Sequence, residues 1–138
     1  MSSESLNWCI KKAIDAGIKI VIDVNWRPTF WQNQFSEGEL PSVAAKKEIN
    51  SILENASIIK LAKEEAEWFF NSIDPVKISS MLTNRPSIIV TNGSKPVSWL
   101  INNNFGTTNA ISPDLVVDTT GAGDSFTAGL IYSLLPFE

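Results

Sequence analysis

Apolar residues follow two spacings along this chain, one typical of helices and one typical of buried strands. Between residues 6 and 16 the apolar side chains fall on one helical face and Gly17 follows as a C-terminal cap, which predicts a helix. Residues 18–24 then form an apolar run rich in β-branched side chains, which predicts a buried strand. A helix that leads directly into such a strand is typical of α/β folds with a parallel sheet.

The alternation of helices and strands continues through the rest of the chain. Pro41 is expected at the first position of a helix, and Asp74 is expected to cap another helix whose first position is Pro75. No internal repeat and no Pro/Gly/Ser-rich linker divides the chain, so we expect one α/β unit over residues 1–138. The further strands are predicted over residues 57–61, 87–91 and 97–101, and the further helices over residues 41–55, 64–70, 74–82 and after residue 121.

The composition fits one globular domain and limits its partners. Of the 138 residues, 43% are hydrophobic and 19% are charged, which is enough apolar material for a core. The net charge of −4 provides no basic field for nucleic acid or an anionic membrane, so neither is expected as a partner. No apolar run reaches the roughly 20 residues of a membrane span, and the first residues lack the basic start of a signal peptide, so a cytoplasmic location is expected.

Cysteine and histidine usage narrows the chemistry. Cys9 is the single cysteine, which excludes an internal disulfide, and its apolar helical neighbours lead us to expect it in the core. The chain has no histidine, which removes Ser-His and Cys-His nucleophilic schemes as well as histidine metal sites. Proton transfer in an enzyme of this composition must therefore depend on a carboxylate.

Two closely spaced glycines, Gly121 and Gly123, link a short apolar strand to the last predicted helix. A threonine before them can cap the helix, and the N–H groups of Gly121, Ala122 and Gly123 can then approach a ligand without steric screening. These donors and the positive end of the helix dipole favour a phosphate group. Asp124 follows directly, and it either accepts the proton of an attacking hydroxyl or only complements the dipole.

The string Asp118-Thr119-Thr120-Gly121-Ala122-Gly123-Asp124 resembles the C-terminal signature of the PfkB-type carbohydrate kinases, the ribokinase-like family. The resemblance implies ATP-dependent phosphorylation of a sugar primary hydroxyl, with fructose as the first candidate. It implies Asp124 as the catalytic base and the residues from Gly121 to Asp124 as an anion hole. It also implies a three-layer α/β/α ribokinase-like fold with a mostly parallel sheet, of which this chain is a partial domain, the nucleotide-binding and catalytic half.

A second polar segment follows the first predicted strand, where open α/β sheets usually bind ligands. Asn25 and Arg27 can reach phosphate oxygens there, or they can belong to an ordinary loop in which Arg27 pairs with a surface acid. The spacing Asp23-x-Asn25-x-Arg27 resembles the D-x-N-x-R segment of fructokinase-like members, which implies that Asn25 and Arg27 bind phosphate. Trp26, Phe30, Trp31 and Phe35 are expected to form a hydrophobic cluster rather than a sugar-stacking surface.

Two further family motifs are present with departures. The N-x-x-E pattern aligns with residues 62–65 and implies that Glu65 orients Mg²⁺ through water, although Ala62 replaces the asparagine. An acidic first turn is alternatively explained by the helix dipole alone. Thr91-x-Gly93 resembles the family's T-x-G segment, which contacts nucleotide phosphates, or is an ordinary hairpin turn; Pro96 replaces a later glycine of that pattern.

The resemblance also implies partners beyond ATP, Mg²⁺ and the sugar. A monovalent cation, often K⁺, would be held by backbone oxygens near Asp118 and Thr120, and a homodimer of the full-length protein is compatible with the family. Two alternatives stay open: a kinase for another alcohol such as ribose, 2-keto-3-deoxygluconate or a nucleoside, and a noncatalytic PfkB-like interaction protein. The intact Asp124 argues against the noncatalytic alternative, whereas Ala62 and Pro96 argue for it.

Overall fold

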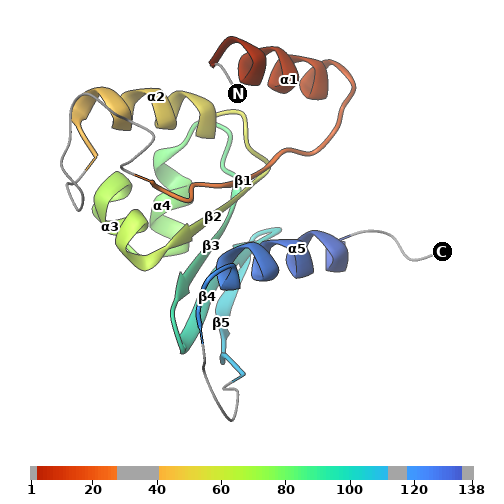
Figure 1. Ribbon diagram of the computed structural model, residues 1–138. Coiled ribbons are helices and arrows are strands. Elements are labelled where there is room, and N and C mark those ends of the chain that lie inside the picture. Colours follow the sequence, from red (N-terminus) through yellow and green to blue (C-terminus); the bar gives the residue numbers. More distant parts are fainter. Residues whose placement is uncertain (1–2, 28–40, 112–117, 135–138) are drawn as a thin grey trace.

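The structure, a computed structural model, describes residues 3–27, 41–111 and 118–134 (Figure 1). Helices and strands alternate along most of the chain, as the sequence predicted. The helices are α1 (Ser3–Asp15), α2 (Val43–Leu53), α3 (Lys63–Phe70), α4 (Pro75–Met81) and α5 (Ala122–Leu134). The strands are β1 (Val21–Asp23), β2 (Ile58–Ala62), β3 (Ser87–Asn92), β4 (Lys95–Ile101) and β5 (Asn104–Thr108).

The described strands form one mixed sheet in the order β1-β2-β3-β4-β5. The pairs β1–β2 and β2–β3 are parallel, and the pairs β3–β4 and β4–β5 are antiparallel. Only β4 therefore runs against the other four strands, which confirms the mostly parallel α/β sheet. The hairpin between β4 and β5 turns at Asn102 and Asn103, whose φ angles of 48° and 65° suit asparagine. β5 itself was not predicted from the sequence.

One face of the sheet, which we call the closed face, carries Ile59, Leu61, Ile88 and Val90. Period-two alternation along β2 and β3 places these side chains on the same side, and each is at most 2% exposed. Figure 1 shows α2, α3 and α4 grouped on one side of the sheet. Their apolar residues complete the same core, which includes Ala45, Leu53, Ala66, Phe69, Phe70, Ile78 and Leu82.

The opposite face, which we call the open face, carries Asp23, Lys60, Ile89 and Thr91. Asp23 pairs with Lys60 and Lys60 pairs with Ile89 in the parallel register, so these residues form a row across three strands. Figure 1 shows α5 on this side, away from α2, α3 and α4. α5 contains no buried residue, although its sequence is apolar. Lys60 and Ile89 on the open face are themselves only 6% and 2% exposed, whereas the helix on this side stays exposed.

Several local predictions can be compared with the structure. Asp74 caps α4 with Pro75 in its first turn, as expected. Pro41 does not begin α2, because the side chain of Ser42 accepts the N–H of Ala45 and makes Ser42 the N-cap. Cys9 is exposed rather than in the core, since no described element buries its side of α1. Within the described residues no helix is long and apolar enough to cross a membrane.

Candidate active site at the start of helix α5

The turn that leads into α5 is built around Gly121. Its φ of +76° is a left-handed conformation that side chains other than glycine rarely adopt. The N–H of Ala122 donates to the carbonyl oxygen of Thr119 over 3.1 Å, so this donor is already used. Among the residues that the structure describes, the N–H groups of Gly121, Gly123 and Asp124 have no acceptor. These exposed donors and the helix dipole form an arrangement that suits an anion.

Asp118 stabilises the first part of this turn. Its Oδ1 atom accepts the backbone N–H and the hydroxyl of Thr120, each over 2.9 Å. The hydrogen bonds from the backbone and hydroxyl of Thr120 lower the pKa of the Asp118 carboxyl below its usual value of 3.8. The Thr120 hydroxyl therefore fixes the carboxylate of Asp118. No described N–H of α5 donates to the oxygen of that hydroxyl, so the expected threonine cap is not seen at Thr120.

A cavity of about 1100 Å³ lies between the open face and α5. Its lining brings together Thr91, Gly93, Ala122 and Gly123, four of the residues expected to bind phosphate. The rest of the lining is largely apolar and includes Ile89, Val97, Trp99, Phe126 and Leu130. A concave, mostly apolar site with a few polar groups at one end is typical of small-ligand sites.

The hairpin that carries Thr91 and Gly93 is irregular at this cavity. The β3–β4 register shifts between Val90 and Asn92, and Thr91 falls in the irregular step. Pro96, which has no N–H to donate to a ladder, lies between Lys95 and Ser98, the β4 residues that flank this shift. Thr91 instead donates its hydroxyl to the carbonyl oxygen of Leu61 over 3.3 Å. The family departure at Pro96 thus coincides with a bulge beside the cavity.

Asp124 lies in the first turn of α5 and is exposed. Its carboxylate forms no hydrogen bond or ion pair with any described residue, and Asp124 does not line the cavity. A carboxylate without a partner at this position is available to a substrate hydroxyl. Its role as base stays a prediction.

Asn25 and Arg27 follow β1 and are both exposed. Asn25 has a left-handed φ of 44°, and Arg27 donates its Nη1–H to the carbonyl oxygen of Trp26 over 3.4 Å. Neither residue lines the cavity. Trp26 is buried and packs edge-to-face on Phe69 at a ring distance of 5.9 Å, as the hydrophobic-cluster interpretation requires. Phe30, Trp31 and Phe35 lie outside the described residues.

Glu65 is 6% exposed and both of its carboxylate oxygens accept backbone N–H groups. Oε1 accepts from Trp26 over 2.6 Å and Oε2 accepts from Ala62 over 2.7 Å. The bond from Ala62 to Glu65 is one of the two hydrogen bonds of a capping box at the start of α3. The other bond is missing, because Ala62 has no side-chain oxygen that could accept the N–H of Glu65. Glu65 therefore ties the segment after β1 to the end of β2, and its proposed contact with magnesium stays a prediction.

An ion pair that sequence reasoning did not assign to the site joins the open face to α5. Lys60 Nζ lies 3.1 Å from both carboxylate oxygens of Asp23, and the two side chains are only 7% and 16% exposed. Asp23 Oδ2 also accepts the hydroxyl of Thr127 in α5 over 2.8 Å. A lysine inside the apolar run of β2 was the sequence signal, because a buried charge requires a partner.

Magnesium binding by this chain stays a prediction. The described residues contain no group of three or more His, Cys, Asp or Glu side chains that could hold a metal ion. Mg²⁺ commonly takes only one or two protein carboxylates together with substrate phosphates and waters. A magnesium ion held in that way would not require such a group of side chains.

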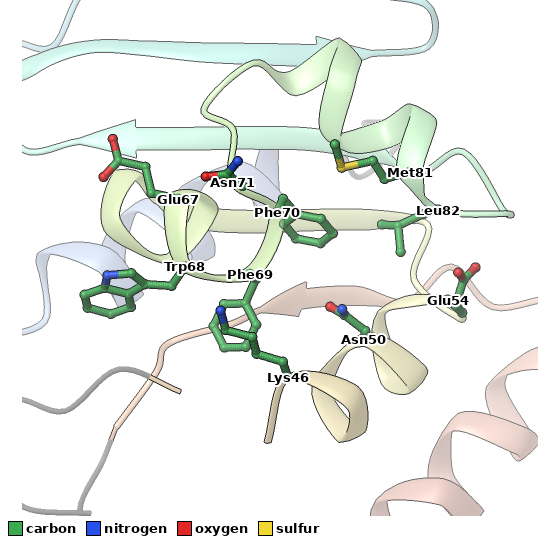
Figure 2. A pocket seen from close by; sticks show the side chains of 10 residues that line it. All are labelled: Lys46, Asn50, Glu54, Glu67, Trp68, Phe69, Phe70, Asn71, Met81 and Leu82. Carbon is green, nitrogen blue, oxygen red and sulfur yellow. The ribbon is translucent and has the colours of Figure 1, made fainter. Parts of the chain in front are cut away.

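A second hollow lies among α2, α3 and α4 and is shown in Figure 2. It has a volume of about 640 Å³ and shares no lining residue with the cavity beside α5. The Oδ1 atom of Asn50 is buried at this hollow and has no hydrogen-bond partner among the described residues. None of the predicted site residues lies here.

Comparison with known proteins identifies the family of this chain. The model of the family described as pfkB family carbohydrate kinase matches residues 1–137 of this chain. A fructokinase of Salmonella thompson is 34% identical over 122 residues, which are 86% of this chain and 51% of that protein. A probable chloroplastic fructokinase-6 of Arabidopsis thaliana is 32% identical over 128 residues, which are 90% of this chain and 31% of that protein.

A solved structure extends the comparison to the fold. The crystal structure of fructokinase with bound ATP from Xylella fastidiosa superposes with a TM-score of 0.71 at 26% identity. The superposition covers 94% of this chain and 38% of that one. The chain therefore spans about a third to a half of the length of these relatives.

Proposed function

This chain belongs to the pfkB family of carbohydrate kinases, and we propose that the protein that carries it transfers the γ-phosphoryl group of ATP to a sugar hydroxyl. Fructose is the first candidate sugar, because the relatives of this chain include fructokinases from bacteria and plants. The observation that carries the proposal is the set of N–H groups at Gly121, Gly123 and Asp124 that have no acceptor among the described residues, with Gly123 lining the cavity. They supply the donors that a transferring phosphoryl group requires.

In the proposed reaction Asp124 accepts the proton of the sugar's primary hydroxyl as its oxygen attacks the γ-phosphorus of ATP. The bond between that phosphorus and the bridging oxygen breaks, and ADP leaves with the electron pair. The N–H groups of Gly121, Gly123 and Asp124 stabilise the negative charge on the transferred group. Ala122 contributes through its place in the turn, because its own N–H already bonds Thr119.

The remaining expected residues bind or orient the reactants. Thr91 and Gly93 lie at the cavity and contact the nucleotide phosphates. Asn25 and Arg27 do not line the cavity, and their phosphate role rests on the D-x-N-x-R resemblance alone. Magnesium, when bound, would neutralise charge on the phosphates, and Glu65 would reach it through water. A monovalent cation would be held by backbone oxygens near Asp118 and Thr120. The same proposal includes a possible homodimer of the full-length protein and a cytoplasmic location.

A second candidate function is a noncatalytic member that retains the fold. The observations that favour it are Ala62, which leaves the capping box of α3 one-sided, and Pro96, which lies opposite the bulge at Thr91. A kinase for ribose, 2-keto-3-deoxygluconate or a nucleoside is the alternative within the enzyme class.

The test is ATP-dependent phosphorylation of a sugar panel headed by fructose, with the protein at its full natural length and with residues 1–138 alone. Phosphorylation of fructose above the other sugars is the expected result for the full-length protein. Preference for another alcohol would replace fructose as substrate. ATP binding without transfer to any sugar would instead support the noncatalytic candidate.

A further inference from the structure

The ion pair between Lys60 and Asp23 has no role in the function proposed above. Both side chains lie on the open face, where neighbouring positions such as Ile89 are apolar. Lys60 is 6% exposed, so its charge is largely removed from water. Burying a charge costs free energy even when it is paired, and a hydrophobic pair would often be at least as stable. The structure therefore carries this pair at a position where stability alone does not require it.

The ammonium group of Lys60 lies at the glycine turn itself. A Cβ atom added to Gly123 would come within 3.2 Å of Lys60 Nζ, which is closer than most real Cβ contacts. Nothing else lies within 4 Å of that position. Gly123 is thus restricted by a neighbouring cation, whereas Gly121 has nothing within 4 Å and is restricted by its φ of +76°.

The carboxylate end of the pair holds the first turns of α5. Asp23 Oδ2 accepts the Thr127 hydroxyl over 2.8 Å, and the same hydroxyl lies 3.0 Å from the carbonyl oxygen of Gly123. The contact with Asp23 is the shorter of the two and is strengthened by the carboxylate charge. The ammonium group of Lys60 therefore lies at Gly123, and the carboxylate of Asp23 lies at Thr127, four residues further along α5.

We propose that Lys60 is a positioning residue for phosphoryl transfer: with Asp23 and Thr127 it fixes the start of α5 against the sheet and places positive charge behind the anion-binding N–H groups. Lys60 acts through Gly123 and does not itself contact the phosphate in this inference. The role of the Lys60 charge in ATP binding rests on the proposed function. The role of Lys60 in anchoring α5 rests on geometry alone. The two roles can be separated by experiment.

The variants separate charge from anchoring. Lys60→Met removes the charge and leaves Asp23 buried without its partner. Lys60→Met with Asp23→Asn removes both charges, which restores much of the stability lost in the single variant. Lys60→Arg keeps the charge. Lys63→Met is the matched control, because Lys63 pairs with Glu67 over 3.8 Å on the exposed side of α3.

Calorimetry of ATP and adenosine binding to the full-length protein measures the charge role. We expect Lys60→Met and the double variant to weaken ATP by about tenfold relative to adenosine, since only ATP carries phosphates. Lys60→Arg should recover most of that loss, and Lys63→Met should show none. A double variant that binds ATP as tightly as the unmodified protein would overturn the charge role.

Amide hydrogen exchange over residues 122–128 measures the anchoring role and does not depend on activity. Faster exchange in Lys60→Met than in Lys63→Met is expected, and equal exchange would overturn the inference. If the unmodified protein binds no ATP, the proposed function fails, and the exchange result alone decides whether Lys60 anchors α5.

Discussion

The two faces of this sheet differ in how tightly helices pack on them. On the closed face Ile59, Leu61 and Ile88 are fully buried under α2, α3 and α4. On the open face α5 lies beside a large cavity and buries none of its residues. The same strands supply both faces, because alternate side chains point to opposite sides. The closed face therefore accounts for most of the packing energy of the described residues, and the open face carries the candidate site.

Polar groups show the same contrast. On the closed-face side the hydroxyl of Ser79, which is 4% exposed, donates to the carbonyl oxygen of Pro86 over 2.8 Å. At the start of α5 the N–H groups of Gly121, Gly123 and Asp124 have no acceptor among the described residues. Unpaired donors next to a cavity are what a binding site requires and what a core avoids. Substitutions on the two sides should therefore change different quantities.

The largest effect is expected from Asp124→Asn at the open face. Removing the proposed base should lower the rate of sugar phosphorylation by about 10²–10⁴-fold, with ATP affinity and stability nearly unchanged. Steady-state kinetics of the full-length protein measure this rate. Asp74→Asn is the matched control, because asparagine caps a helix as well as aspartate does and Asp74 only caps α4. Full activity in Asp124→Asn would remove the base role.

The next largest effect is on stability and belongs to the closed face. Leu61→Ala should lower the free energy of unfolding by about 2–5 kcal/mol, because Leu61 is fully buried and the substitution leaves a cavity. Ile131→Ala in α5 should cost less than about 1 kcal/mol, because Ile131 is 42% exposed. Urea unfolding followed by tryptophan fluorescence measures both. Equal losses would show that α5 is packed as tightly as the core.

The closed face was the more predictable of the two. The strands at residues 57–61 and 87–91 were found nearly as observed, because burial on both sides produces a continuous apolar run. The cap at Asp74 was also readable, since it depends on local geometry. Pro41 was misjudged because Ser42, one residue later, has a side chain that accepts the N–H of Ala45. This error concerns only the first residue of the helix.

The open face was less predictable because its features depend on tertiary contacts. β5 has few apolar residues and forms by pairing with β4, so its sequence alone did not predict a strand. The helical spacing around Cys9 predicted an apolar face correctly but not whether any element covers it. Asp23 and Lys60 are 37 residues apart, and only the parallel register brings them together.

A smaller effect on stability is expected from alanine substitutions at two glycines, each of which has open space where a Cβ atom would lie. Gly121→Ala should destabilise the turn before α5 by roughly 1–2 kcal/mol, because φ is +76° there. Gly129→Ala should stabilise α5 by roughly 0.5–1 kcal/mol, because Gly129 lies inside the helix and a Cβ would meet nothing within 4 Å. Amide exchange within α5 measures both shifts. Opposite signs are expected, and equal signs would contradict the conformational explanation for Gly121.

The smallest effect concerns the protonation of Asp118 at the same turn. Hydrogen bonds from Thr120 lower the pKa of this carboxyl below 3.8, so its contribution to stability is present above that pH and is lost as the pH falls through the folded-state pKa. Thr120→Val removes the hydroxyl donor and keeps the backbone donor, so the pKa of Asp118 should move back toward 3.8. An NMR titration of the Asp118 carboxyl carbon measures this shift. Thr119→Val is the control, since only the backbone of Thr119 affects that pKa. An unchanged pKa in Thr120→Val would mean that the backbone N–H alone fixes the carboxylate of Asp118.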